Sequence, residues 1–304
     1  MADIKSPDLS IVILNFNVKL LLLDCLESIF KHKGKEDEWQ IIVVDNASMD
    51  NSVEAVKEKF PEVEIVVNKT NIGFSAGNNE GVKKAKAPVI LFLNPDTVIV
   101  GDAIEKTYQY LMGNPDIGAI TARVELPDGR LDYSSHRGFP TPWNSFCYFS
   151  GLSKIFPKSR LFAGYAATYL DINTTHEIDC ITGAFLMVRK IAGEQINFWD
   201  TDYFFNGEDI EFCYSLKEKG WKIFFYPEVK IIHYKGSSSG LWSSGKQVVD
   251  KDTKLSSASH GTSAMRIFYK KHYYKKYPPI VRDAVLVGIK LLEHYRKAKI
   301  WISQ

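Results

Sequence analysis

Asp96 lies at a position in the chain that favours chemistry. It ends the stretch Asn94-Pro95-Asp96, directly after the apolar run 89–93. Such a run is typical of a strand buried on both faces, so these residues lie where the strand leaves its sheet. Open α/β sheets bind ligands at that carboxyl edge, and a carboxylate there suits a divalent cation that bridges to a diphosphate. A cap for a following helix explains Asp96 equally well.

Polar and small residues also follow the other strands predicted in the first half. They are Asn15 and Asn17 after the first strand, Asp45 after the second, and Asn71, Gly73 and Asn78 after the third. Asp45 is suited to accept a hydrogen bond from a base or a ribose hydroxyl, or to form an Asx turn. The glycines near residue 73 allow backbone N–H groups to approach a phosphate at a helix start, or allow a helix to pack closely on the sheet. The recurrence of such residues at one sheet edge predicts a ligand site.

The elements that must position these residues alternate along the first 125 residues. Strand-like runs fall at 9–14, 40–44, 63–67, 89–93 and 117–124, with helical patterns near 18–33, 50–60, 75–86 and 101–113. Strands separated by helices of this length indicate βαβ units. We therefore expect an α/β fold, with a Rossmann-like, mainly parallel mixed sheet flanked by helices.

The second half is less regular. Residues 133–175 are aromatic-rich without clear periodicity. We then expect a strand at 178–189, a helix at 208–219, short strands at 222–226 and 229–233, and helices at 263–276 and 280–301. Thirteen of the 28 residues from 236 to 263 are Gly or Ser, a composition typical of flexible chain. The expected division is a domain at 1–235 (a donor half at about 1–125 and an acceptor half at about 126–235), a flexible loop at 236–262 and a basic helical extension at 263–304.

Composition limits the class of protein. The 304 residues are 45% hydrophobic, enough for a sizeable core, and the four cysteines form no CxxC pair. No stretch of about 18 apolar residues is present, and the first residues are acidic where a signal peptide is basic and then apolar. These features favour a cytoplasmic protein with reduced thiols. The net charge of +2 is uneven, because residues 264–304 hold ten Lys/Arg and two Asp/Glu, or +8, which leaves −6 for the rest.

Three motifs together resemble the inverting family 2 glycosyltransferases, which have the GT-A fold. They are Val-Asp-Asn-Ala-Ser-Met-Asp at 44–50, Asn-Ile-Gly-Phe-Ser-Ala-Gly-Asn-Asn at 71–79 and Asn-Pro-Asp at 94–96. The second and third are similar to the rhamnosyltransferase and galactofuranosyltransferase branch. The resemblance covers roughly residues 9–236. It implies a nucleotide sugar donor, either a dTDP-sugar or a UDP-sugar. Rhamnose is the first expectation for the transferred sugar.

The resemblance also implies a role for each donor-side residue. Asp45 would contact the base, helped by the backbone near Asn15, and Asp96 would hold Mg²⁺ or Mn²⁺ against the diphosphate, with His233 completing the metal shell. The full donor set that we expect is Asn15, Asn17, Asp45, Asn71, Gly73, Asn78, Asn94 and Asp96. The chain departs from the family at two of these positions. Asn94 replaces the usual first aspartate of the metal motif, and Asn78 replaces an arginine that faces the diphosphate.

On the acceptor side, the stretch 206–212 resembles the family's Glu-Asp motif, so Asp209 is expected to deprotonate the acceptor hydroxyl and Glu208 to orient the loop or the acceptor. A helix N-terminus favours an ionised carboxylate, although acids are common there for capping alone. Thr182 and Gly183 resemble the family's acceptor-side strand. Trp199 is expected either to stack on a sugar or to belong to the core.

The function implied is metal-dependent, inverting transfer of a sugar to a glycan or lipid-linked acceptor in polysaccharide synthesis. A sugar-1-phosphate nucleotidyltransferase would carry a glycine-rich loop after the first strand, which is absent here. A non-catalytic sugar-nucleotide binding protein stays open. The amphipathic, basic segment 280–301 fits a membrane surface on the inner face of the cell membrane, or a second subunit in a homodimer. No nucleic-acid partner is expected.

Overall fold

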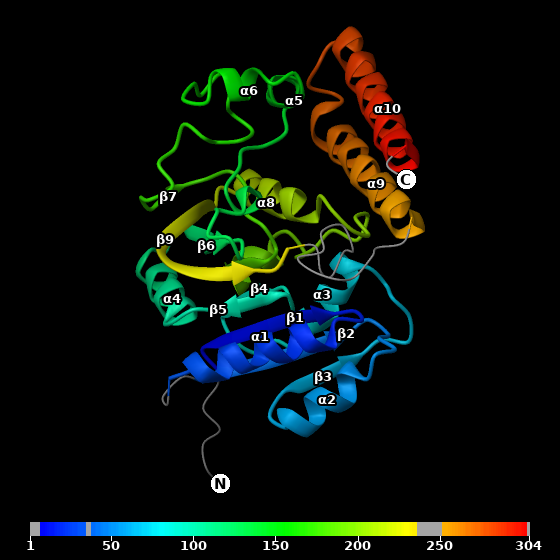
Figure 1. Ribbon diagram of the computed structural model, residues 1–304. Coiled ribbons are helices and arrows are strands. Elements are labelled where there is room, and N and C mark those ends of the chain that lie inside the picture. Colours follow the sequence, from blue (N-terminus) through cyan, green and yellow to red (C-terminus); the bar gives the residue numbers. More distant parts are fainter. Residues whose placement is uncertain (1–6, 35–37, 236–250, 303–304) are drawn as a thin grey trace.

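One mixed sheet organises the chain. The computed structural model describes residues 7–34, 38–235 and 251–302. Within these residues nine strands form a single sheet in the order β3-β2-β1-β4-β8-β6-β9-β5, with β7 paired to β9 (Figure 1). This architecture confirms the predicted α/β, GT-A-like fold.

The first half of the sheet is parallel, as the alternating pattern predicts. Its elements are β1 (Leu9–Asn15), α1 (Lys19–His32), β2 (Trp39–Asp45), α2 (Ser52–Lys59), β3 (Glu64–Val67), α3 (Phe74–Val82) and β4 (Val89–Leu93). All five side chains of β4 are buried, which explains its uninterrupted apolar run. Since β3, β2, β1 and β4 run in the same direction, their carboxyl ends share one edge.

The second half of the chain extends this sheet with antiparallel partners. Its elements are β5 (Thr97–Ile99), α4 (Ala103–Gly113), β6 (Ile117–Glu125), η1 (Tyr133–Ser135), α5 (Pro142–Phe149), α6 (Leu152–Ile155), β7 (His176–Glu177), β8 (Phe185–Arg189), α7 (Lys190–Glu194), α8 (Glu208–Glu218) and β9 (Lys222–His233). β8 runs antiparallel to β4 and β6, and β5 antiparallel to β9. The residues that precede β8 therefore meet those that follow β4.

Two strand predictions need correction. The run predicted as a strand at 178–189 is a strand only from Phe185 to Arg189, because Cys180 instead exchanges two backbone hydrogen bonds with Arg137 outside the sheet. The two short strands expected at 222–226 and 229–233 are one strand, β9, whose register against β6 shifts at a bulge.

The C-terminal helices differ from the prediction at one end. Helix α9 (Lys251–Phe268) begins well inside the segment expected to be a flexible loop at 236–262, whereas residues 236–250 lie outside the described part of the chain. A Cβ added at Gly207 would lie 2.8 Å from Ala264 Cβ, so α9 packs tightly against the start of α8. A π-helical turn, η2 (Tyr269–Tyr273), and α10 (Pro279–Ile302) complete the chain.

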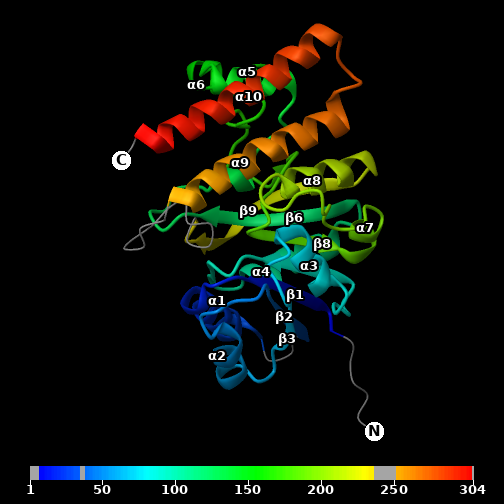
Figure 2. The same cartoon turned by 90° about the vertical axis from the view of Figure 1, so that its right-hand side faces the viewer.

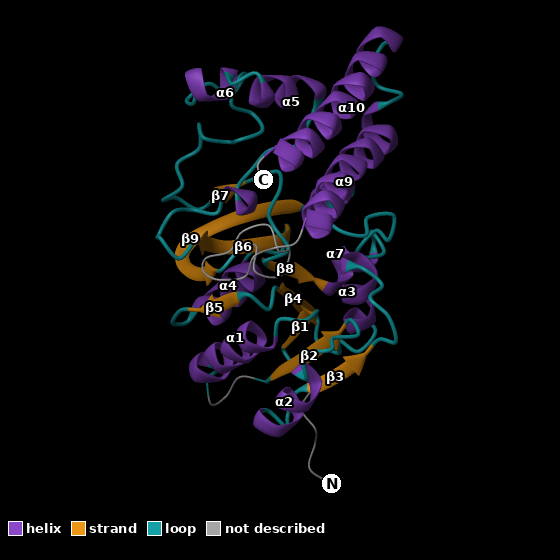
Figure 3. Cartoon of the chain, turned by 45° about the vertical axis from the view of Figure 1, so that its right-hand side comes forward, coloured by secondary structure: helices purple, strands orange, loops and turns teal. Residues whose placement is uncertain are grey.

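Helices cover both faces of the sheet, and α9 and α10 form a further layer over α8 (Figures 2 and 3). One core lies between the sheet and helices α1, α2 and α4, and a second between the sheet and helices α3 and α8. A third cluster, which includes Tyr214 and Phe268, joins α8 to α9 and η2. All four cysteines are free and buried. No helix in the described ranges combines the length and apolarity needed to span a bilayer.

Candidate active site

A cavity of about 2510 Å³ opens beside the carboxyl edge of the parallel strands, beneath α5, α9 and α10. It brings together side chains that are distant in sequence, above all Asp96 and Asp209. The predicted site residues that line it are Asn71, Gly73, Asn94, Asp96, Thr182, Gly183, Glu208, Asp209 and His233. Ligand pockets usually measure about 300–1,000 Å³, so this cavity exceeds the needs of one small molecule.

Strand register explains why Asp96 meets His233. Thr97, the first residue of β5, pairs with His233, the last residue of β9. Asp96 therefore lies beside His233, with Asp96 Oδ1 3.2 Å from His233 Nε2. Both side chains are buried. Burial would lower the pKa of His233, but hydrogen bonds to Asp132 and Asp96 raise it to about 9.

Asp132 is a buried site residue that sequence reasoning missed. Its Oδ2 lies 3.0 Å from His233 Nδ1, and its Oδ1 accepts a hydrogen bond from Lys235 Nζ at 2.6 Å. Burial would raise the pKa of Asp132, but the hydrogen bond from His233 and the charge of Lys235 hold it well below its usual value. The sequence Pro-Asp-Gly-Arg at 127–130, which is typical of a turn, reverses the chain, so Asp132 returns to the end of β6 and its backbone N–H donates to Val124 O. This turn is the sequence feature that could have indicated that Asp132 returns toward the sheet edge.

The first turn of α8 presents two carboxyl groups to the cavity. Gly207 begins the helix with φ of +86°, a conformation that favours glycine, and Glu208 and Asp209 follow it. Asp209 Oδ1 accepts a hydrogen bond from the Ile210 backbone N–H at 2.8 Å. Burial, reinforced by the charge of Asp209, raises the pKa of Glu208 to about 8. The two neighbouring acids thus have different surroundings.

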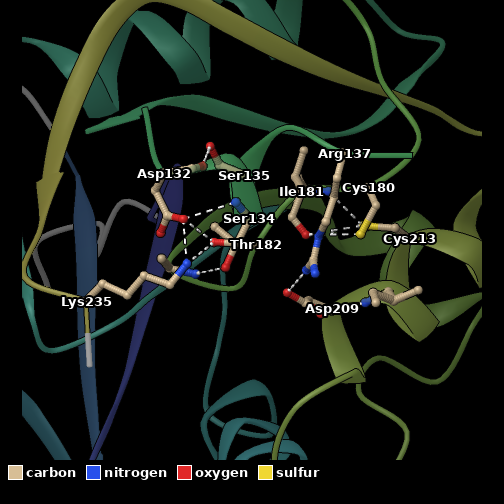
Figure 4. A network of polar contacts seen from close by, with 12 residues as sticks. Asp132, Ser134, Ser135, Arg137, Cys180, Ile181, Thr182, Asp209, Cys213 and Lys235 are labelled. Carbon is tan, nitrogen blue, oxygen red and sulfur yellow. Dashed lines mark hydrogen bonds and ion pairs between the residues drawn. The ribbon is translucent and has the colours of Figure 1, made fainter. Parts of the chain in front are cut away.

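Arg137 is the second residue that sequence reasoning missed. Its guanidinium donates a hydrogen bond to Asp209 Oδ2, and both side chains are largely buried. Figure 4 shows the two side chains pointing toward one another, Asp209 from the start of α8 and Arg137 from the loop after η1. The backbone bonds between Arg137 and Cys180 fix this loop. No motif marks Arg137, because it falls in the segment without periodicity.

Three predicted donor residues, Asn15, Asn17 and Asp45, are not among the residues that line the cavity. Asp45 accepts hydrogen bonds from Asn15 Nδ2 at 2.8 Å and from the Ser48 backbone N–H at 2.8 Å. Asn17 Oδ1 accepts from the Met49 N–H at 2.7 Å. These contacts tie the end of β1 to the loop after β2. Donor contact by Asp45, Asn15 and Asn17 stays a prediction, and in this structure their polar atoms hold that loop.

The motif at 71–79 mainly packs helix α3. Asn78 Nδ2 donates to Phe74 O at 3.0 Å within the helix, and Asn78 is not among the residues that line the cavity, so its contact with the donor stays a prediction. A Cβ at Gly77 would lie 2.5 Å from Leu14 Cδ1, so this glycine permits close packing of the helix on the sheet. Asn71 and Gly73 do line the cavity, and Asn71 Oδ1 accepts from the Gly73 N–H at 2.9 Å.

On the acceptor side, Thr182 and Gly183 reach the cavity because β8 runs antiparallel to β4. Trp199 does not line the cavity, and of the two roles left open for it the structure favours the core. Its side chain is 1% exposed and makes edge-on contacts with Phe74 and Phe92. Trp199 is a core residue.

The surroundings of Asp96 fit a divalent cation bound with help from the substrate. Within the described ranges, no group of three or more His, Cys, Asp or Glu side chains is arranged to hold a metal by itself. Mg²⁺ commonly binds through one or two protein carboxylates, with phosphate oxygens and water as the other ligands. A histidine ligand usually gives its second ring nitrogen to a carboxylate, as His233 Nδ1 does toward Asp132. Asp96 and His233 Nε2 are therefore suitable ligands, and metal binding would release the proton that the raised pKa keeps on His233.

Comparison with known proteins identifies the family. The model for glycosyl transferase family 2 matches residues 10–173, more than half of the chain. The chain therefore belongs to this family. It is a glycosyltransferase, and its donor is a nucleotide sugar.

Individual relatives are distant. The N-acetylglucosaminyl-diphospho-decaprenol L-rhamnosyltransferase of Mycobacterium tuberculosis is 23% identical over 211 residues, which cover 66% of this chain and 68% of the relative. The poly-β-1,6-N-acetyl-D-glucosamine synthase of Staphylococcus epidermidis is 27% identical over 226 residues, 72% of this chain and 48% of the relative. The chain thus spans only about half of the synthase.

Solved structures show the same fold. A mannosyltransferase from Pyrobaculum calidifontis in complex with GDP-Man and Mn²⁺ matches with a TM-score of 0.57 and 14% identity, over 98% of this chain and 74% of that one. GalNAc-T7 with UDP, GalNAc and Mn²⁺ matches with a TM-score of 0.56 and 15% identity, over 89% of this chain and 55% of that one.

Proposed function

We propose that the chain transfers a sugar, with inversion at the anomeric carbon, from a nucleoside diphosphate sugar to a glycan or lipid-linked acceptor in polysaccharide synthesis. The observation that carries this proposal is that Asp96 and Asp209 line the same cavity. One carboxylate suits the diphosphate side of a donor and the other suits the attacking hydroxyl. A single in-line displacement needs such groups on the two sides of the reacting carbon.

Asp209 accepts the proton of the acceptor hydroxyl as its oxygen attacks. Arg137 holds one carboxylate oxygen and the Ile210 N–H holds the other, so the orientation of Asp209 is fixed before substrate binds. Glu208, whose pKa is raised to about 8, is largely protonated at neutral pH and can donate a hydrogen bond to the acceptor.

On the donor side, Asp96 and His233 are the residues that would hold Mg²⁺ or Mn²⁺, and Asp132 would orient the imidazole. The metal, when bound, offsets the negative charge that grows on the departing nucleoside diphosphate. Asn71 and Asn94 contribute polar groups to the same wall. Two structures with the same fold contain Mn²⁺, which supports this assignment.

We propose rhamnose from dTDP-rhamnose as the first donor to test, because the Mycobacterium tuberculosis relative is a rhamnosyltransferase. The same name motivates a lipid-linked acceptor carrying N-acetylglucosamine diphosphate, reached from the cytoplasmic face of the membrane. UDP-sugars are the second group of donors to test.

The experiment is a screen of dTDP-rhamnose and several UDP-sugars by thermal shift with Mg²⁺, with Mn²⁺ and with a chelator. Each stabilising donor is then incubated with a short prenyl diphospho-N-acetylglucosamine, and the anomeric configuration of any product is read by NMR. Metal-dependent stabilisation followed by product of inverted configuration supports the proposal. Donor binding without transfer to any acceptor and without hydrolysis indicates a binding protein, and a retained configuration excludes this mechanism.

A further inference from the structure

Two segments that are far apart in sequence hold most of the exposed large apolar side chains. Of the twenty such side chains in the described residues, seven lie in 143–161 and five in 280–301. The first range covers α5 and α6, and the second lies within α10. In Figures 1 and 2 these helices occupy one end of the molecule, with α1 and α2 at the other end. Exposed apolar groups gathered in this way mark an interaction surface.

Both segments border the mouth of the active-site cavity. Phe146 and Phe149 of α5 line it from one side, and Leu291 and Tyr295 of α10 line it from the other. These four side chains are 52–65% exposed. The apolar rim therefore faces outward while its inner edge leads toward Asp209.

The charge around this rim is positive. Residues 138–170 contain Lys154, Lys158 and Arg160 and no Asp or Glu. All three side chains are exposed. On α10, Arg296 and Lys299 border the cavity itself. A partner that fits this surface must combine an apolar interior with negative groups at its boundary.

A second copy of this chain does not meet that requirement. In a symmetric dimer through this face, the same patch would meet itself, so basic side chains would lie opposite basic side chains. A bilayer that contains anionic lipids does meet it, because aromatic and apolar side chains enter the headgroup boundary while Lys and Arg pair with phosphates.

We propose that α5, α6 and α10 together form a membrane-docking surface that binds an anionic bilayer and turns the mouth of the cavity toward it. The surface is wider than the amphipathic segment 280–301 alone, because seven of its twelve exposed large apolar side chains lie in residues 143–161. Under the proposed function, an acceptor lipid would then reach Asp209 without leaving the membrane. Binding of the bilayer itself does not depend on catalysis.

The experiment is flotation of the full-length protein with vesicles of phosphatidylcholine alone or with added phosphatidylglycerol. The parent should float with the mixed vesicles and remain below with phosphatidylcholine alone. A Lys154→Glu/Lys158→Glu double variant should bind mixed vesicles at least about tenfold more weakly than the parent. Both lysines are exposed, so the fold should be retained. Lys57→Glu, an exposed lysine of α2, is the matched control and should bind like the parent.

A second pair of variants tests the apolar part. Phe146→Ser/Phe149→Ser on α5 and Leu291→Ser/Tyr295→Ser on α10 should each reduce flotation severalfold, whereas Leu20→Ser, 72% exposed on α1, should not. Unchanged flotation of the α5 variants overturns the proposal, as does binding of the lysine variant at the parent level. Light scattering that shows a dimer dissociated by the same substitutions also overturns it. Thermal shift with nucleotide sugars on the same samples tests the proposed function separately.

Discussion

Arg137 donates a hydrogen bond to Asp209 across the cavity wall, and the two residues form a largely buried ion pair. They are 72 positions apart, and backbone pairing of Arg137 with Cys180 brings the guanidinium to the start of α8. The pair fixes one oxygen of the carboxylate and leaves the side chain at the edge of the cavity.

Replacing Arg137 with Met should lower the free energy of unfolding by about 3 kcal/mol, because removal of one partner leaves a buried charge without its counter-ion. Denaturant unfolding followed by circular dichroism measures this loss. Arg130→Met is the matched control, since Arg130 pairs with Asp128 on the exposed surface and should change stability by less than about 1 kcal/mol. Equal losses in the two variants would contradict a structural role for the Arg137–Asp209 pair.

Asp132→Asn should raise by about tenfold the Mn²⁺ concentration that is needed to strengthen nucleotide binding, because outer carboxylates orient metal-binding histidines. The measurement is the Mn²⁺ concentration that gives half-maximal affinity for dTDP or UDP in calorimetry. Asp128→Asn, in the preceding exposed turn, is the control. If chelation leaves nucleotide affinity unchanged in the parent, Asp96 and His233 do not hold a metal.

The raised pKa of Glu208 predicts how the stability of the protein depends on pH. Its pKa is raised in the folded state from 4.5 to about 8, so the folded protein binds this proton more tightly than the unfolded chain does. Stability from this group is therefore fully present below about pH 4.5 and is lost as pH rises through about 8. Glu208→Gln removes the ionisation, so the stability of the variant relative to the parent should increase from about pH 5 to about pH 8. If the difference in unfolding free energy between Glu208→Gln and the parent stays constant over this pH range, the raised pKa of Glu208 is contradicted.

The sequence predicts the donor half of the fold well, because buried parallel strands such as Val89–Leu93 and the helices between them have clear periodicities. Motifs mark Asp96 and Asp209, and the family resemblance adds His233; all three line one cavity. In the motif at 71–79, Asn71 and Gly73 line the cavity, whereas Asn78 bonds to the helix backbone.

The missed residues depend on tertiary contacts that local pattern does not contain. Arg137 reaches Asp209 through a backbone bridge to Cys180, and Asp132 reaches His233 through the parallel pairing of β6 with β9. The early start of α9 was hidden by its Ser- and Gly-rich sequence. There, a composition typical of flexible chain forms a helix from Lys251 onward.

The role of Asp209 as the base is tested most directly by measuring donor affinity and sugar transfer side by side in the parent and in Asp209→Asn. The account predicts that the variant binds the nucleotide sugar with parent affinity and transfers at least about a hundredfold more slowly, because the proton acceptor is gone. Glu218→Gln, exposed at the far end of α8, should match the parent in both measurements. Transfer by Asp209→Asn at a near-parental rate would remove Asp209 from the reaction and contradict the account.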